Sequence, residues 1–291
     1  MIGDGVYARG RHVTDISQCS FYHVTDLPGH GVVGWGWDLR GAEDEYLGGV
    51  DFDRKRVLEL GTSSGFLCRH MERRGAEVVG YDLSDEHAWD SVPFAQCDMS
   101  EYTLEMKAYL RMQNNAWWYA HRLFGSRARA VYGQVYDIPD QIGTVDVATF
   151  GSLLLHVRDP FLALQSALRL TRETVIVTDL HPDQAADDAP STKGRLRRRL
   201  RAFTAYRSRP APVMRFVPDF RTAQPARSST WWALYPELVV EMLGVLGFER
   251  TEVSFHSQKL LVEPGRSEWK SMRLFTVVGR RTRGMPSLGA P

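Results

Sequence analysis

Two glycines and one acid have the spacing of a nucleotide-binding turn. The run VLELGTSSG, residues 57–65, is typical of an apolar strand entering a tight turn, where Gly61 and Gly65 let the backbone approach a ligand closely. Asp82 ends the next apolar run about twenty residues later, where a carboxylate can accept hydrogen bonds from ribose hydroxyls. The chain has neither a G-x-G-x-x-G dinucleotide fingerprint nor a G-x-x-x-x-G-K-[ST] phosphate loop. The pattern predicts nucleotide or nucleoside binding. The alternative is a turn that serves the fold alone.

The elements that must position these residues alternate between strand and helix. A strand at 56–60, a helix at about 64–74 ended by Gly75, and a strand at 76–81 form one unit whose two strands must be parallel. Further strands are expected at 129–132, 144–150, 174–178, 250–255 and 274–278, and helices at 106–124, from 160 onward and at 236–246. This order predicts an α/β fold with a mostly parallel sheet and helices on both faces.

The chain is predicted to be one α/β domain with additions. Residues 1–55 are expected to form an irregular or partly helical lead-in or lid, residues 56–282 the ligand-binding domain, and residues 283–291 a disordered tail. Residues 83–128 and 182–230 interrupt the alternation with aromatics and prolines. We interpret these two stretches as insertions that build a cap.

The first two motifs of the domain carry a family resemblance. VLELGTSSG followed by EVVGYDL resembles the opening motifs of class I S-adenosylmethionine-dependent methyltransferases. The resemblance implies a Rossmann-like sheet of seven strands, the last of them antiparallel, and S-adenosylmethionine as the cofactor. It places Glu59 under the methionine end of the cofactor and Asp82 at the ribose. The residues that it assigns to the turn around the cofactor are Gly61, Thr62, Ser63 and Gly65.

A later loop resembles the part of the same family that lies beside the adenine. This loop is GQVYDIP, residues 133–139. Relatives often place an acid where this chain has Gln134, and Asp137 is nearby, so the adenine contact stays open between these two residues. The resemblance also assigns Val135 and Gly151 to the cofactor site.

The segment FGSLLLHVRDP, residues 150–160, narrows the resemblance to one branch. It is similar to the end of the fourth strand in tRNA wobble-uridine modifying methyltransferases and their small-molecule relatives. His156 could act there as a general base, because imidazole titrates near neutral pH. It could instead pack against the sheet and cap the loop. We favour packing, because methyl transfer from a sulfonium needs mainly alignment and desolvation.

Tryptophans outside the strands are candidates for the substrate pocket. Aromatic faces attract cations, and the cofactor is a sulfonium. We expect Trp117, Trp118, Trp231 or Trp232 to face a pocket whose floor is Gly151 and Ser152; the alternative is packing of the insertions onto the domain. Arg40 could pair with a carboxylate of the cofactor or the substrate, or could be an exposed arginine without such a role.

Composition restricts the partners. Lys+Arg 36 against Asp+Glu 35 leaves a net charge of +1, which favours no nucleic-acid partner, although residues 193–201 contain a basic run that could hold phosphates. We expect neither a membrane span nor a signal peptide, and three scattered cysteines predict no disulfide framework, no metal site and a cytoplasmic location. The oligomeric state, monomer or homodimer, stays open.

The sequence therefore predicts a methyltransferase that acts on a small molecule, such as a natural-product intermediate or an acid. Its product from the cofactor would be S-adenosylhomocysteine. Three alternatives stay open. The same cofactor could serve another alkyl transfer, such as cyclisation of its own aminobutyl chain with release of methylthioadenosine. The substrate could be tRNA. The chain could also bind the cofactor as a scaffold without catalysis.

Overall fold

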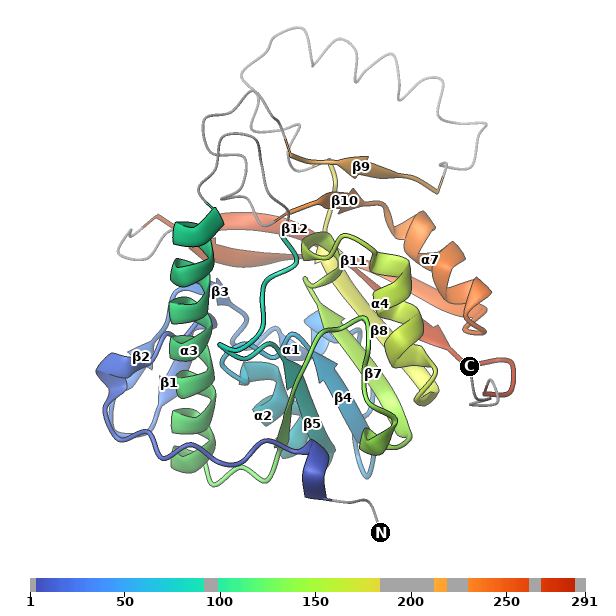
Figure 1. Cartoon of the computed structure of the whole chain (residues 1–291). Coiled ribbons are helices and arrows are strands. Elements are labelled where there is room, and N and C mark those ends of the chain that lie inside the picture. The colour runs from blue at the N-terminus through green and yellow to red at the C-terminus, as the bar shows by residue number, and fades with distance from the viewer. Residues whose placement is uncertain (1–3, 92–98, 184–211, 219–229, 262–267, 286–291) are drawn as a thin grey trace, which may run out of the picture.

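The computed structural model describes residues 4–91, 99–183, 212–218, 230–261 and 268–285. Its centre is an eight-stranded sheet in the order β3-β11-β12-β8-β7-β4-β5-β6 (Figure 1). Five neighbouring strands run parallel: β8 (Thr171–Leu180), β7 (Val145–Gly151), β4 (Arg56–Leu60), β5 (Glu77–Asp82) and β6 (Arg129–Tyr132). The long strands β11 (Arg250–Leu261) and β12 (Lys270–Arg280) are antiparallel to each other, and β12 is antiparallel to β8. The predicted α/β fold is confirmed.

The expected number of seven strands is wrong, because the N-terminal lead-in contributes one. β3 (Gly36–Asp38) pairs antiparallel with the end of β11, where Leu260 faces Trp37. β11 continues beyond the predicted residue 255 to Leu261, and this extension supplies the unpaired edge that β3 covers. The lead-in also holds the β1 (Thr25–Leu27) and β2 (Gly31–Val33) pair, the short helix α1 (Glu43–Tyr46), and two 3-10 turns at Asp4–Val6 and Ile16–Gln18.

Helices cover both faces of the sheet. α4 (Pro160–Leu168) and α7 (Pro236–Val245) pack on one face, while α2 (Phe66–Arg73), α3 (Met99–Leu123) and the lead-in pack on the other (Figure 1). The parallel strands are mostly apolar because both faces of the sheet are covered there. The predicted helix from residue 160 is confirmed as α4, which Asp159 caps by accepting the N–H of Leu162 at 2.9 Å, with Pro160 in the first turn.

The two insertions are only partly within the described residues. In the first, α3 begins at Met99, seven residues before the predicted start. In the second, β9 (Met214–Phe216) pairs antiparallel with β10 (Trp232–Leu234), which lies just past the predicted end of the insertion. β10 contacts the 3-10 turn Leu154–His156 after β7, and another 3-10 turn, Asp140–Ile142, precedes β7. The basic run at 193–201 and the end of the predicted tail lie outside the described residues. Within the described ranges, no helix has the length and apolar character needed to cross a membrane.

Candidate active site

The glycine turn lies between β4 and α2 at the carboxyl edge of the parallel strands. Gly61 has φ 77° and Gly65 has φ 73°, the left-handed region in which glycine carries no steric penalty. A side chain at Gly65 would also collide with the indole of Trp117, whose Cδ1 lies 2.7 Å from the ideal Cβ position. Because Gly65 cannot continue the helix in this conformation, α2 begins one residue later. The predicted strand–turn–helix arrangement is confirmed.

Asp82 ends β5 directly beside this turn. Its two carboxylate oxygens accept the backbone N–H groups of Ser63 at 2.6 Å and of Leu83 at 2.7 Å. Burial raises the pKa of Asp82 to about 6, and these two hydrogen bonds lower it in part. Each oxygen retains a lone pair, so Asp82 can still accept a hydrogen bond from a ligand hydroxyl.

Helix α3 fixes the outer side of the turn. Gln113 donates to the hydroxyl of Ser63 at 3.0 Å, and Asn114 donates to the carbonyl of Leu83 at 3.1 Å. A small pocket lies beside Asp82, lined by residues of the turn, β5, β6 and α3, Thr62 and Ser63 among them. The amides of α3 therefore position both segments that the sequence assigned to the cofactor.

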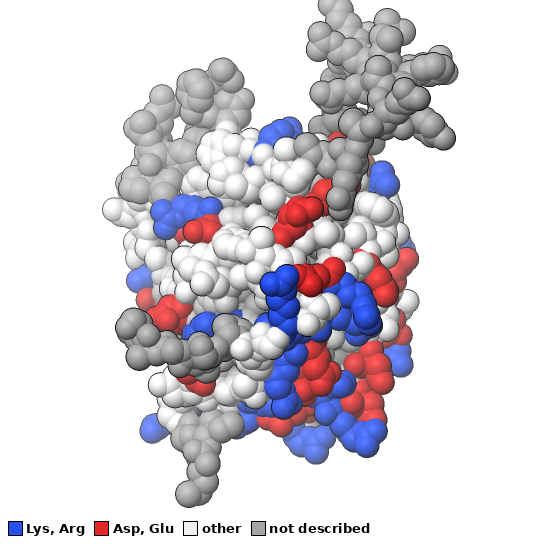
Figure 2. Space-filling view, turned by 90° about the vertical axis from the view of Figure 1, so that its right-hand side faces the viewer, with Lys and Arg blue, Asp and Glu red and all other residues white. Residues whose placement is uncertain are grey.

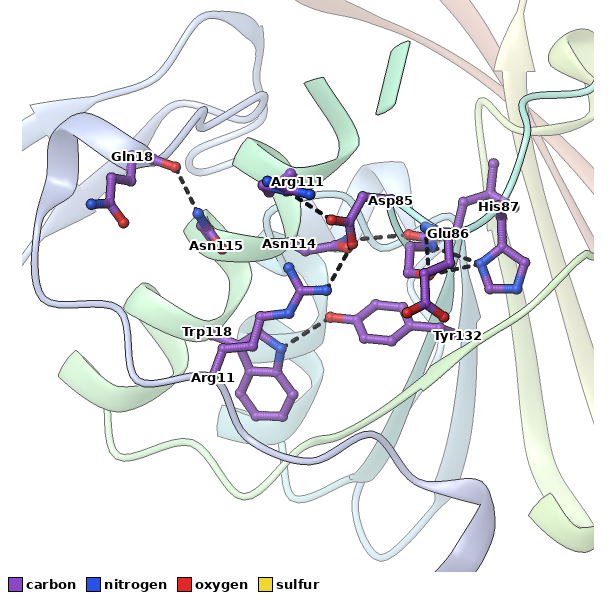
Figure 3. Close-up of polar contacts among 12 residues, drawn as sticks. Arg11, Gln18, Asp85, Glu86, His87, Arg111, Asn114, Asn115, Trp118 and Tyr132 are labelled. Atoms are coloured by element: carbon purple, nitrogen blue, oxygen red, sulfur yellow. Dashed lines mark hydrogen bonds and ion pairs between the residues drawn. The ribbon is translucent and has the colours of Figure 1, made fainter. Parts of the chain in front are cut away.

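The N-terminal lead-in is tied to the same region. Arg11 and Arg111 reach the carboxylate of Asp85 from the lead-in and from α3, at 3.0 and 2.8 Å (Figure 3). Below them the indole of Trp118 donates to the hydroxyl of Tyr132 at 3.0 Å. Asp85, which follows β5 three residues after Asp82, thus connects its own segment with the lead-in and with α3.

The loop at residues 133–139 leaves both candidates for the predicted adenine contact available. The amide of Gln134 donates to the carbonyl of Ala88 at 2.9 Å, so its own carbonyl oxygen remains an acceptor. Asp137 is exposed, and Val135 is buried in the core beneath the loop. The choice between Gln134 and Asp137 stays a prediction.

The end of β7 meets a residue from the lead-in. The hydroxyl of Tyr46 lies 3.2 Å from the hydroxyl of Ser152 and 3.1 Å from the ideal Cβ position of Gly151. Ser152 has φ 49°, an uncommon conformation for a side-chain-bearing residue. His156 ends the following 3-10 turn half-buried, with its backbone N–H donating to Leu153. Neither interpretation of His156 is tested by these contacts.

The four predicted pocket tryptophans fall into two separate pairs. Trp117 and Trp118 lie in α3 with their rings 4.6 Å apart, against Gly65 and Tyr132, and so pack where α3 meets the turn and the sheet. Trp231 and Trp232 cover the segment after β7, and the backbone N–H of Trp231 donates to Leu155 at 2.8 Å. The two indole N–H groups of this second pair donate to the backbone carbonyls of Asp90 and Arg158. The second pair therefore lies nearer the predicted floor, and the pocket role of all four stays a prediction.

Arg40 is engaged within the chain. Its guanidinium pairs with Asp38 at 2.8 Å and with Asp26 at 3.0 Å. Two carboxylates of the lead-in therefore already neutralise this side chain. Its predicted pairing with a ligand carboxylate has no support in these contacts.

A sequence-family model described as a methyltransferase domain matches residues 42–218, which is more than half of the chain. The chain belongs to this methyltransferase family. No curated protein matches it in sequence.

Two solved structures are similar to this methyltransferase, and the first of them shares its fold. The N-terminal domain of EvdMO1 with S-adenosylhomocysteine bound is 17% identical, with a TM-score of 0.50, covering 94% of this chain and 100% of that one. The magnesium protoporphyrin IX methyltransferase of Synechocystis PCC 6803, also with S-adenosylhomocysteine, is 11% identical, with a TM-score of 0.44, covering 82% of this chain and 81% of that one. The chain is a class I methyltransferase and uses S-adenosylmethionine.

Buried polar atoms without partners in the structure test whether the site fits this cofactor. Glu59 and Thr149 face each other across β4 and β7, and their side-chain atoms Oε2 and Oγ1 have no hydrogen-bond partner. Ser64 Oγ in the turn and Asp179 Oδ2 at the end of β8 are likewise unpartnered. Burial raises the pKa of Glu59 to about 7, mainly through desolvation. Unpartnered acceptors beside the turn fit a cationic ligand that carries donors.

The candidate site includes residues that the sequence did not predict. Asp179 had a visible signal, an acid inside the apolar strand run TVIVTDL. Gln113 and Asn114 had a weaker one, a polar pair on a helix face that otherwise buries aromatics. Tyr46 had none, because its partner Ser152 is 106 residues away in the sequence.

Proposed function

We propose that this methyltransferase transfers the methyl group of S-adenosylmethionine to a small molecule. The observation that carries the proposal is the cover over the carboxyl end of β7. There β10 and Trp231 lie on Leu155, with only 8% of Trp231 exposed. An acceptor reaching Gly151 and Ser152 must fit beneath this cover, which favours a compact ligand over a folded nucleic acid.

The chain's own residues perform the binding. The turn from Gly61 to Gly65 surrounds the methionine part of the cofactor, and Asp82 accepts hydrogen bonds from its ribose hydroxyls. The bound cofactor supplies an electrophilic methyl group on a sulfonium. Tyr46 and Trp231 exclude water from the edge where the acceptor approaches, which strengthens every electrostatic contact there.

The charge distribution also favours a small substrate. Basic and acidic side chains are intermixed on the face shown in Figure 2. Arginines of the described chain pair with acids, as in Arg172–Asp146 and Arg283–Glu249. A continuous basic face for a phosphate backbone is not visible on this side. The tRNA alternative rests on the basic run at 193–201, outside the described residues, and on the branch that residues 150–160 resemble.

One experiment separates the candidate functions. The protein is incubated with S-adenosylmethionine alone, then with tRNA, then with pools of small metabolites, and the products are identified by mass spectrometry. We expect S-adenosylhomocysteine together with a methylated metabolite in the third reaction only. Methylthioadenosine from the cofactor alone would establish cyclisation instead, methylated tRNA would establish the tRNA activity, and no product in any reaction would contradict catalysis.

A further inference from the structure

Asp179 is a buried carboxylate at the carboxyl end of β8. It is 2% exposed, and its Oδ1 accepts the backbone N–H of Leu180 at 2.7 Å. The N–H of Leu155 also faces the carboxylate, but Oδ2 has no hydrogen-bond partner. Unpartnered buried oxygens are rare in folded proteins, and an ionisable one is costly to keep.

The position of Asp179 relates it to the cofactor turn. Thr178, its neighbour in β8, is paired with Gly151, and the N–H of Ser152 donates to the carbonyl of Thr178 at 2.7 Å. The next residue, Leu153, lies 3.4 Å from the ideal Cβ position of Gly61. The segment 151–155 therefore contacts the cofactor turn on one side and Asp179 on the other.

Anchoring the segment 151–155 does not explain why residue 179 is a charged carboxylate. An asparagine could accept the same backbone N–H groups through its carbonyl oxygen without a buried anion. A metal ion would need further ligands, and within the described ranges no cluster of three His, Cys, Asp or Glu side chains could hold one. The remaining use for Oδ2 is to meet a donor on a ligand.

Building on the function proposed above, we propose that Asp179 is the catalytic base of the transfer and that the acceptor atom is a hydroxyl oxygen. The hydroxyl oxygen forms a bond to the methyl carbon as the carbon–sulfur bond breaks. The electron pair of that bond stays on sulfur, leaving a neutral thioether, and the hydroxyl proton moves to Oδ2 of Asp179. One cation and one carboxylate become neutral, so charge and atoms balance.

The hydroxyl class follows from the need for a base. A neutral amine can attack the methyl group first and lose its proton to water afterwards. A hydroxyl that attacked with its proton in place would become a strongly acidic oxonium, so its proton must leave during the transfer. A carboxylate held in a dry site at the carboxyl end of β8 supplies this acceptor.

Binding of a cofactor analogue tests the placement without any acceptor. Sinefungin carries a C–NH₃⁺ group where the cofactor carries its methyl-bearing sulfonium, whereas S-adenosylhomocysteine has a neutral sulfur. The affinities of both are measured by titration calorimetry with the full chain at about pH 8, where carboxylates are ionised. The preference for sinefungin over S-adenosylhomocysteine should fall about tenfold in Asp179→Asn, because one charge-assisted hydrogen bond is lost.

The control variant is Asp183→Asn, at an exposed acid four residues after Asp179. The carboxylate of Asp183 accepts a hydrogen bond from the hydroxyl of Tyr235. This variant should leave the preference unchanged. Asp179→Ser, measured in parallel, provides a smaller replacement should the asparagine disturb folding. An equal loss of both ligands in the Asp179 variants, or no loss, would overturn the proposal. If the wild-type chain bound neither ligand, the proposed function itself would fail.

A second measurement tests the acceptor class. S-adenosylmethionine with a CD₃ group is incubated with phenols and alcohols and with matched amines, and the labelled products are fragmented. We expect O-CD₃ ethers, lost in Asp179→Asn while the cofactor still binds. Labelled amines made equally well by the variant would refute a proton-accepting role for Asp179.

Discussion

Replacing Glu59 by glutamine should stabilise the protein and weaken its cofactor binding. The carboxylate is 4% exposed with one oxygen unpartnered, and burial raises its pKa from 4.5 to about 7. At 1.36 kcal/mol per pH unit, this rise in pKa means that the ionised carboxylate lowers the free energy of unfolding by about 3 kcal/mol at most. The unpaired amide of glutamine offsets part of this gain, so about 1–3 kcal/mol is expected.

The sign depends on pH in a defined way. Below about pH 4 the acid is protonated in both the folded and the unfolded chain, and Glu59→Gln should change stability little. As the pH rises through 4.5, the unfolded chain loses its proton first, so the free energy of unfolding of the wild type falls. Above pH 7 the folded chain has also ionised, and the cost is complete.

Urea denaturation of both proteins at about pH 4 and about pH 8 measures this difference. Glu252→Gln, an exposed acid on β11, is the matched control and should show no comparable gain. Titration with S-adenosylhomocysteine should show weaker binding to Glu59→Gln, because the carboxylate that the family resemblance places under the methionine end is lost. A stability gain that did not depend on pH, or a loss at the higher pH, would refute the reasoning from burial.

Three further substitutions, one of them with a matched control variant, test the site and its cover. Asp82→Ala should weaken binding of S-adenosylhomocysteine by about 1–3 kcal/mol in calorimetric titration, and unchanged affinity in a folded variant would remove Asp82 from the site. Gly65→Ala should lower the free energy of unfolding by more than about 1 kcal/mol, because φ 73° is strained and Trp117 is 2.7 Å away. Gly29→Ala is the control, because Gly29 has φ 78° but no atom within 4 Å of the added Cβ, so the change introduces backbone strain without a steric clash. It should lower the free energy of unfolding by less than Gly65→Ala in the same urea experiment. Trp231→Phe removes one N–H bond to a backbone carbonyl and should cost about 1 kcal/mol in urea denaturation, and an unchanged stability would show that the bond contributes nothing.

Local patterns in the sequence determined the parallel half of the fold. Mostly apolar runs of four to seven residues predicted β4 through β8, because strands buried on both faces need largely apolar side chains. The glycine turn and Asp82 were recognisable because their roles depend on backbone conformation and on one strand end, both of which are local. The cap of α4 at Asp159 was readable for the same reason.

The remaining site depended on contacts between distant segments. Tyr46 reaches Ser152 only because α1 packs over the sheet, and Thr178 fixes Tyr46 by donating to its carbonyl at 2.7 Å across 132 residues of sequence. The eighth strand exists because β11 extends past its predicted end and leaves an edge for β3.

Asp179 shows most clearly the difference between what the sequence indicates and what the tertiary structure decides. The sequence displayed an acid in an apolar strand, but its unpartnered oxygen became evident only with the register of β8 against β7 and the segment that follows Gly151. Composition and periodicity indicate which secondary structure and which degree of burial each residue favours. Which polar atoms are left without partners is decided by how the whole chain packs.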